Sequence, residues 1–256
     1  MRVEVLGAHN TETDKARLPS VLVDGAVALD AGGLTASLPL ERQQQIKSVL
    51  LTHHHFDHCK DLIMLGANSL PGSTIDVYGL RDTLETVYLY LLDGRLYRDY
   101  TIWPSADNPR MKLNPVAMFQ PLALRNLEVL PLPVNHTVPS AGYFVRADNG
   151  RSFFYAGDTG PGLEGCWERI APDLMIIEVT GVNRVREEME KLCHMTPALL
   201  AEELMEFRKA RGYLPRVIVN HIPVAYEDEM RGELAAAGKQ LEMELEVGYE
   251  GLIVEL

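Results

Sequence analysis

Residues 52–58 read Thr52-His53-His54-His55-Phe56-Asp57-His58, so four imidazoles and one carboxylate fall within seven positions. The apolar run Ser48-Val49-Leu50-Leu51 precedes them and has the length of a buried strand. After them, the apolar residues of 62–65 indicate the first turns of a helix. The polar cluster is therefore predicted where a strand meets a helix, a junction that can aim several side chains at one point.

The spacing within this cluster favours two neighbouring metal ions. Side chains two apart in an extended chain point the same way, so His53 and His55 can bind one ion while His54 points elsewhere. Asp57 and His58, past the bend, can bind a second ion. Imidazole suits zinc and its neighbours, and carboxylate suits harder divalent ions. An accidental surface run, or a core histidine held by hydrogen bonds, explains a lone histidine better than it explains this combined spacing.

Length and composition predict one globular unit. With 256 residues and 46% hydrophobic content, the chain can bury a large core. No Pro/Gly/Ser-rich linker divides it, so we expect a single domain over residues 1–256. The first residues lack the parts of a signal peptide, and no stretch approaches the roughly 18 apolar residues of a membrane span. The three cysteines show no pairing pattern, which predicts a cytoplasmic protein without a membrane segment.

The net charge of −12 is spread along the chain rather than gathered in blocks. No stripe of lysines and arginines is present that would follow a phosphate backbone, which disfavours a large nucleic-acid substrate. A small phosphorylated substrate remains compatible with this charge, because two metal ions would supply local positive charge.

Three more predicted strands end in residues that suit a metal. They are 127–134, 152–156 and 216–219, and they deliver in turn His136, Asp158 and His221. Any one of these residues alone would more often be structural than metal-binding. Their shared position at apolar strand ends, after the 52–58 cluster, favours the metal. Because strands and helices alternate, we expect sheets with helices packed outside.

The rest of the chain fits the same alternation. Further strands are predicted at 3–7, at 20–30 with a tight turn at Asp24-Gly25, and at 74–78, 143–147, 174–179 and 252–254. Helices are predicted at 39–46, 81–92, 196–211 and 227–241. Residues 93–121 hold prolines and aromatic residues without a steady period, which predicts a loop-rich cap that could overhang a substrate. Asp30, at a strand end, is either a turn residue or a partner that orients a metal-binding histidine.

These motifs together resemble the metallo-β-lactamase fold. That family combines His-x-His-x-Asp-His with a later His, a later Asp and a last His, matched here in order over most of the chain. The resemblance implies an α/β (α+β) fold, a four-layer αββα sandwich with a dinuclear metal site along one edge. It implies one ion held by His53, His55 and His136, a second held by Asp57, His58 and His221, and Asp158 bridging them.

Within this superfamily the sequence resembles the phosphodiesterase branch, which includes class II cyclic-nucleotide phosphodiesterases and tRNase Z. The resembling segments are 134–143, 155–161 and 193–197. The flavodiiron branch has Glu in place of His55, and the antibiotic-hydrolysing branch has Cys in place of Asp158. Phe56 is a departure, because tRNase Z usually has Gly there and the class II enzymes usually have Leu. The Gly/Pro-rich basic arm of tRNase Z is also missing, although some members lack it.

His194 falls where these phosphodiesterases have a histidine that lies near the metals without binding them. The alternative is a solvated His194 ahead of a helix that Thr196 caps. Cys59 and Cys193 each flank metal-site histidines, so each is either a soft ligand or a free thiol. The family also suggests a homodimer.

The resemblance and the residues together predict a metal-dependent hydrolase that cleaves a cyclic nucleotide or a similar small phosphodiester. A hydroxide bridging two divalent ions would attack phosphorus; Zn²⁺ is expected, and Mn²⁺ or Fe²⁺ is compatible. Asp57 would orient the hydroxide, and His194 would protonate the leaving oxygen. Three alternatives stay open: tRNase Z-like RNA cleavage, hydrolysis of a thioester or lactone, and a metal-bound sensing protein without turnover.

Overall fold

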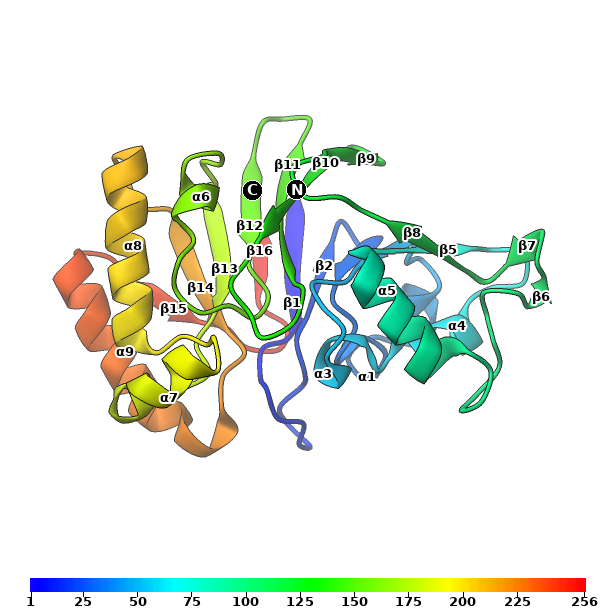
Figure 1. The fold of residues 1–256 in the computed structure, drawn as a ribbon, viewed down its shortest axis with the longest axis horizontal. Helices are drawn as coiled ribbons and strands as arrows, with labels where there is room; N and C mark the ends of the chain where they lie inside the picture. Colours follow the sequence, from blue (N-terminus) through cyan, green and yellow to red (C-terminus); the bar gives the residue numbers. More distant parts are fainter.

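The computed structural model describes residues 1–256, which form two stacked β-sheets with helices on both outer faces (Figure 1). The strands of the first sheet are β1 (Arg2–Gly7), β2 (Ser20–Val23), β3 (Val27–Leu29), β4 (Ser48–Leu50), β5 (Ile75–Gly79), β8 (Met111–Pro115) and β16 (Ile253–Glu255). Their order across the sheet is β16-β1-β2-β3-β4-β5-β8.

The second sheet is built from the later part of the chain. Its strands are β9 (Leu122–Leu124), β10 (Leu127–Pro133), β11 (Ala141–Ala147), β12 (Ser152–Tyr155), β13 (Leu174–Glu178), β14 (Arg216–Asn220) and β15 (Leu245–Val247). Their order is β15-β14-β13-β12-β11-β10-β9, while β6 (Pro104–Ser105) and β7 (Asn108–Pro109) form a separate small hairpin.

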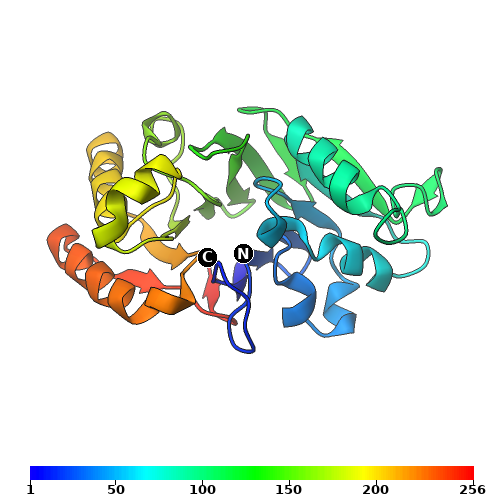
Figure 2. The same ribbon diagram turned by 60° about the horizontal axis from the view of Figure 1, so that its bottom comes forward.

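The helices divide between the two sheets in chain order. The first sheet carries α1 (Leu34–Ser37), α2 (Leu40–Gln43), α3 (Phe56–Cys59), α4 (Leu62–Asn68), α5 (Arg81–Val87) and a π-helical turn at Tyr88–Leu92. The second carries α6 (Glu164–Trp167), α7 (Arg186–Lys191), α8 (Pro197–Arg211), α9 (Glu227–Leu241) and 3₁₀ turns at Asn183–Val185 and Val224–Tyr226. Figure 2 shows the blue-to-cyan helices on one side of the molecule and the yellow-to-red helices on the other.

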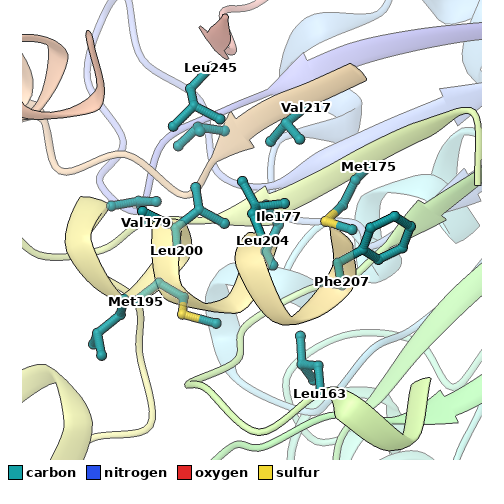
Figure 3. Close-up of a cluster of buried hydrophobic side chains, with 14 of the residues drawn as sticks. Leu163, Met175, Ile177, Val179, Met195, Leu200, Leu204, Phe207, Val217 and Leu245 are labelled. Carbon is teal, nitrogen blue, oxygen red and sulfur yellow. The ribbon is translucent and has the colours of Figure 1, made fainter. Parts of the chain in front are cut away.

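Three layers of buried apolar side chains separate these four layers of secondary structure. In β4, Leu50 packs between the sheets, whereas Val49 packs toward the helices of the first sheet. In β13, Ile176 packs between the sheets, whereas Ile177 packs against the helices of the second sheet, a layer shown in Figure 3. Alternate residues of one strand point to opposite faces, so continuous apolar strands serve two cores. The predicted αββα sandwich is confirmed.

The strand directions bring the carboxyl ends of several strands to one edge. In the second sheet β12, β13 and β14 are parallel, and β10 runs with them because β11 is antiparallel to both β10 and β12. Two hydrogen bonds tie the sheets together here. The Ala141 amide donates to the Thr52 carbonyl at 2.9 Å, and the Tyr143 hydroxyl donates to the Leu51 carbonyl at 2.7 Å.

Local sequence signals predicted several elements closely. Asp24 and Gly25 both have positive φ, as the predicted tight turn requires. Thr196 caps α8 by accepting from the Leu199 amide at 3.3 Å, and α8 ends at Gly212 with a φ of 80°. The short elements α1, α6, α7, β9 and β15 were not predicted, because three to six residues cannot display a period.

The predicted loop-rich segment 93–121 contains a strand of the first sheet, since β8 pairs with β5. Side-chain contacts attach it to α4: Tyr100 is buried against Gly66, and the Arg110 guanidinium donates to the Ser69 carbonyl at 2.6 Å. Its role as a cap over a substrate stays a prediction, as does the single domain. None of the helices is both long and apolar enough to cross a membrane.

Candidate metal centre

Seven side chains predicted as metal ligands converge at the edge where the strands end. The first cluster consists of His53, His55, His136 and Asp158. The second cluster consists of Asp57, His58, Asp158 and His221. Within each cluster the potential ligand atoms lie within 4.8 Å of one another, and Asp158 belongs to both. The geometry is consistent with a dinuclear metal site, while the assignment of each residue as a ligand stays a prediction.

The change from extended chain to helix divides residues 53–58 between the clusters. His55 is the last extended residue, with a ψ of 146°, and Phe56 begins α3. His53 and His55 therefore precede the bend, and Asp57 and His58 follow it. His54 belongs to neither cluster, in agreement with the prediction that it points elsewhere.

Two glycines allow the loops of this edge to approach closely. At Gly157, with a φ of 65°, a Cβ would meet the Thr52 side chain at 2.7 Å. At Gly32, a Cβ would meet the Asp57 carbonyl oxygen at 1.8 Å. The Ala31 amide donates to the His58 carbonyl at 2.7 Å, which also holds α3 against the 31–33 turn.

Asp30 fits both of its interpretations, because it has a positive φ of 58°, as in a turn, and also holds two histidines of the clusters. Its fully buried carboxylate accepts from Nδ1 of His58 at 2.7 Å and from the Tyr155 hydroxyl at 2.9 Å. It also accepts from the Thr52 hydroxyl, which in turn lies 3.0 Å from Nδ1 of His53. Because the hydroxyl proton is given to Asp30, Nδ1–H of His53 must donate to Thr52. We call these residues the Asp30 network.

Glu178 and Thr180 form a similar arrangement that the sequence interpretation missed. The Glu178 carboxylate accepts from Nδ1 of His194 at 2.5 Å and from the Thr180 hydroxyl at 2.6 Å. That hydroxyl lies 2.7 Å from Nδ1 of His221, which must donate to it. We call these residues the Glu178 network. The available signal was a charged residue ending the apolar strand 174–178, the position that the predicted ligands follow in other strands.

Outer hydrogen bonds leave the inner nitrogens free for a metal. His53 and His58 each use Nδ1 outward, and Nε2 of both is buried without a hydrogen-bond partner. Oδ1 of Asp158 also lacks a hydrogen bond, although it lies 3.2 Å from Nε2 of His58. An unsatisfied buried polar atom costs about 1–3 kcal/mol, so a shared partner for these atoms is strongly favoured. Imidazole and carboxylate together suit Zn²⁺, Mn²⁺ or Fe²⁺, and the residues present therefore fit divalent ions.

Burial and neighbouring charges shift the pKa values of several residues in the centre. Burial and the neighbouring His58 hold the pKa of His53 well below its usual range. Burial opposes the charged form of His58, but Asp158 and Asp30 outweigh it and raise the pKa of His58 well above its usual range. Burial likewise opposes ionised Asp158, but His221 and His58 outweigh it and lower the pKa of Asp158. The centre therefore favours positive charge next to Asp158, as a cation site requires.

His194 lies beside both clusters without belonging to either. Its ring centroid is 5.1 Å from that of His136 and 5.8 Å from that of His221. Burial opposes its charged form, but Glu178 outweighs this and raises the pKa of His194 to about 9. His194 also forms a third group of potential ligands with Glu178 and His221, although its Nδ1 is already committed to Glu178. It is held in place rather than merely solvated.

Neither cysteine thiol next to the site belongs to a cluster. Cys59 is buried with its sulfur 3.7 Å from the His54 carbonyl, and burial raises the pKa of its thiol to about 12. Cys193 contributes its backbone instead, since its carbonyl accepts from Nδ1 of His136 at 3.4 Å. Both are free cysteines.

Residues 20–222, which contain all seven predicted ligands, match the family described as the beta-lactamase superfamily domain. The chain belongs to this superfamily. Its two sheets with flanking helices are the metallo-β-lactamase sandwich, and its converging histidines and aspartates make it a hydrolase of this fold with a His/Asp metal site.

One curated relative has the name of an enzyme from the branch that the sequence resembles. The chain is 23% identical over 190 residues to a 3′,5′-cyclic-nucleotide phosphodiesterase of Schizosaccharomyces pombe. The match covers 70% of this chain and 51% of the relative. The chain thus spans about half the length of the curated relative it matches.

Solved structures show the same fold. Unliganded yeast PDE1 has a TM-score of 0.83 at 16% identity, covering 100% of this chain and 99% of that chain. The metallo-β-lactamase fold protein YhfI from Bacillus subtilis has a TM-score of 0.77 at 18% identity, covering 99% of each chain. The short form of human tRNase Z has a TM-score of 0.68 at 20% identity, covering 100% of this chain and 99% of that chain. At such identities the likeness shows the fold alone.

Proposed function

We propose that this protein is a dinuclear metal-dependent phosphodiesterase that hydrolyses a cyclic nucleotide or a similar small phosphodiester. The observation that carries the proposal is the His194–Glu178 pair, a fixed proton donor beside two clusters that share Asp158. The relative named as a 3′,5′-cyclic-nucleotide phosphodiesterase supports the same substrate class.

His194 is proposed to protonate the leaving oxygen. Its Nδ1–H donates to Glu178, so only Nε2 can present a proton toward the clusters. The carboxylate stabilises the imidazolium and keeps that proton available near neutral pH. An alkoxide leaves poorly without a proton, and general acids typically accelerate such steps by about 10²–10⁴-fold. A thiolate leaves readily without one, so this donor favours phosphodiesters over thioesters.

The two clusters are proposed to hold the ions and to position the attacking water. Divalent ions, with Zn²⁺ expected and Mn²⁺ or Fe²⁺ compatible, would lower the pKa of bound water and neutralise phosphate charge. Asp57 lies at the rim of the second cluster, with Oδ2 3.2 Å from Nε2 of His221, and its partly exposed carboxylate can accept a hydrogen bond from water. A cytoplasmic location and a homodimer remain proposals from the sequence and the family.

The experiment compares two phosphodiesters that differ in their leaving group, with protein loaded with zinc or manganese. For the His194→Ala variant we expect kcat on 3′,5′-cyclic AMP to fall about 10²–10⁴-fold. The loss should be much smaller on bis(p-nitrophenyl) phosphate, because a nitrophenolate needs little protonation. His54→Ala, a histidine of the same motif outside both clusters, is the matched control.

Three outcomes would contradict parts of this proposal. Loss of metal in His194→Ala would make His194 a ligand rather than a proton donor. Equal losses on the two esters would remove the proton-donor role. A fully metallated protein that cleaves neither ester would refute the phosphodiesterase.

A further inference from the structure

Phe56 is an exposed aromatic residue between two predicted metal ligands. It is 66% exposed, although the adjacent residues His55 and Asp57 belong to the first and second clusters. A single exposed apolar residue is normal on a protein surface. Phe56 differs from such a residue because its two chain neighbours place their side chains in the two clusters.

The backbone below Phe56 is fixed. Phe56 is the first residue of α3, whose His58 amide donates to the His55 carbonyl at 3.0 Å. The Ala31 amide donates to the His58 carbonyl at 2.7 Å, and the Asp61 amide donates to the Ala31 carbonyl at 2.9 Å. The turn that carries Phe56 is therefore anchored to the 31–33 turn.

Exposed apolar side chains also follow the last predicted ligand. Val224 and Tyr226 belong to the 3₁₀ turn that comes directly after His221-Ile222-Pro223, and they are 38% and 47% exposed. The Arg184 guanidinium lies over the Tyr226 ring at 4.9 Å from its centroid, so Val224 is the free apolar side chain of the two. Helix α3 and the segment after β14 meet at the second cluster, where Nε2 of His221 lies 3.2 Å from Oδ2 of Asp57. Each of the two segments thus carries an exposed apolar side chain close in sequence to a predicted ligand. A ligand that suits this surface combines an anionic group with a planar apolar one.

We propose that Phe56 determines specificity by stacking on a planar aromatic group next to the phosphate of the substrate. This inference rests on the proposed function and names the substrate class: a phosphodiester that carries a nucleobase or an aryl group. Aromatic rings prefer offset stacking on flat π-systems, and base–aromatic stacking is sequence-tolerant because every base has a π-face.

Binding to the metal-loaded protein tests the stacking role without turnover. Isothermal titration would compare AMP, phenyl phosphate and ribose 5-phosphate, which share a phosphate but differ in the aromatic group. We expect Phe56→Ala to weaken AMP binding about tenfold while ribose 5-phosphate binding stays within about twofold. Phe56→Leu, which keeps an apolar side chain but loses the π-face, should lie between the wild type and Phe56→Ala.

Two controls keep the result interpretable. Tyr90, 76% exposed in the π-helical turn at Tyr88–Leu92 and outside both clusters, is the matched aromatic position, and Tyr90→Ala should leave all three affinities unchanged. Metal content is measured for every variant. A Phe56→Trp variant adds a direct readout, since its exposed indole should be quenched by AMP and not by ribose 5-phosphate.

The outcomes separate this inference from the proposed function. A loss confined to AMP identifies a nucleobase, and an equal loss for phenyl phosphate identifies any aryl group; both support stacking. Equal losses for AMP and ribose 5-phosphate, or no loss for either aromatic ligand, would overturn it even if phosphodiesters are hydrolysed. Phe56-dependent AMP binding without hydrolysis of any phosphodiester would refute the phosphodiesterase and keep the stacking role.

Discussion

Two buried carboxylates, one from each sheet, organise histidines on the two sides of the metal centre. Asp30, directly after β3, bonds His58 directly and His53 through the Thr52 hydroxyl. Glu178, at the end of β13, bonds His194 directly and His221 through the Thr180 hydroxyl. The same combination of carboxylate, hydroxyl and two imidazoles thus occurs twice.

The two networks differ in the histidine that each carboxylate bonds directly. His58 is fully buried and belongs to the second cluster, with Nε2 3.2 Å from Asp158. The His194 side chain is 16% exposed and lies outside both clusters. A carboxylate behind a buried histidine fixes its tautomer and orientation. A carboxylate behind a partly exposed histidine can also keep a transferable proton on it. If His194 is the proton donor proposed above and His58 a metal ligand, burial rather than the hydrogen-bond pattern separates the two roles.

The largest effect is expected from removing Asp158, which lies next to a histidine of each network. Nε2 of His58 and of His221 lie 3.2 and 3.4 Å from its carboxylate oxygens. Asp158→Ala should lose both ions and reduce hydrolysis to background, as measured by elemental analysis after dialysis together with the cyclic AMP assay. Asp107→Ala, on the exposed β6–β7 hairpin, is the control. An ion retained in the first cluster would show that Asp158 does not serve both.

Glu178→Gln should affect proton transfer more than metal binding. We expect kcat to fall about 10²-fold with metal content nearly unchanged. A proton donor must hold its proton, so the rate falls as pH rises through its pKa. Because Glu178 raises the pKa of His194, the neutral glutamine should lower it and move the falling limb of the pH–rate profile to lower pH. A variant that instead loses its metal would make Glu178 a support for binding.

Asp30→Asn should show the opposite pattern with a smaller effect. Loss of a carboxylate behind a metal-binding histidine typically weakens metal affinity about 10–100-fold. Competition with a chelator should reveal this loss, while kcat at saturating metal stays close to that of the wild type. A reduced kcat with unchanged affinity would mean that the two networks do not differ in role.

The smallest effect is expected at His9, a buried histidine paired with carboxylates outside both clusters. Nδ1 of His9 lies 2.7 Å from Glu250, and burial is outweighed by Glu250 and Glu227, which raise the pKa of His9 above its ordinary 6.5. Its charged form therefore stabilises the fold fully below pH 6.5, and this contribution is lost as pH rises through the raised pKa.

His9→Gln should accordingly lower the free energy of unfolding on the order of 1 kcal/mol at pH 6, and by less at pH 9. Urea unfolding at the two pH values measures the difference, with metal content as the control. A difference that does not change with pH would remove the charged pair as its cause.

The convergence of the seven predicted ligands could be predicted because their signals are local. The cluster at 52–58 is contiguous, and His136, Asp158 and His221 each follow an apolar strand. Parallel strands bring such ends to one edge, so position along the chain was enough to connect them. The same strands, alternating with helices, predicted sheets with helices packed outside, and the family resemblance supplied the four-layer αββα sandwich.

The partners of these residues could not be predicted, because their importance depends on burial. Glu178 and Thr180 at a strand end look like ordinary polar residues that leave a sheet. Only the packing of the second sheet against the 193–196 turn makes Glu178 1% exposed and brings it to His194. The strand β8 was hidden for a related reason: it is short, lies at a sheet edge and is only partly buried, so its sequence lacks a clear alternation.

Each cluster combines residues from both sheets, and this has a consequence for folding. Asp57 and His58 follow β4 of the first sheet, and His221 follows β14 of the second. An ion bound there would act as a reversible cross-link between the two halves, comparable to a disulfide that closes a very long loop. Since the unfolded chain keeps these ligands far apart, metal saturation should raise the free energy of unfolding by mass action and slow unfolding. Metal supply would then govern how long the protein stays folded as well as its catalytic rate.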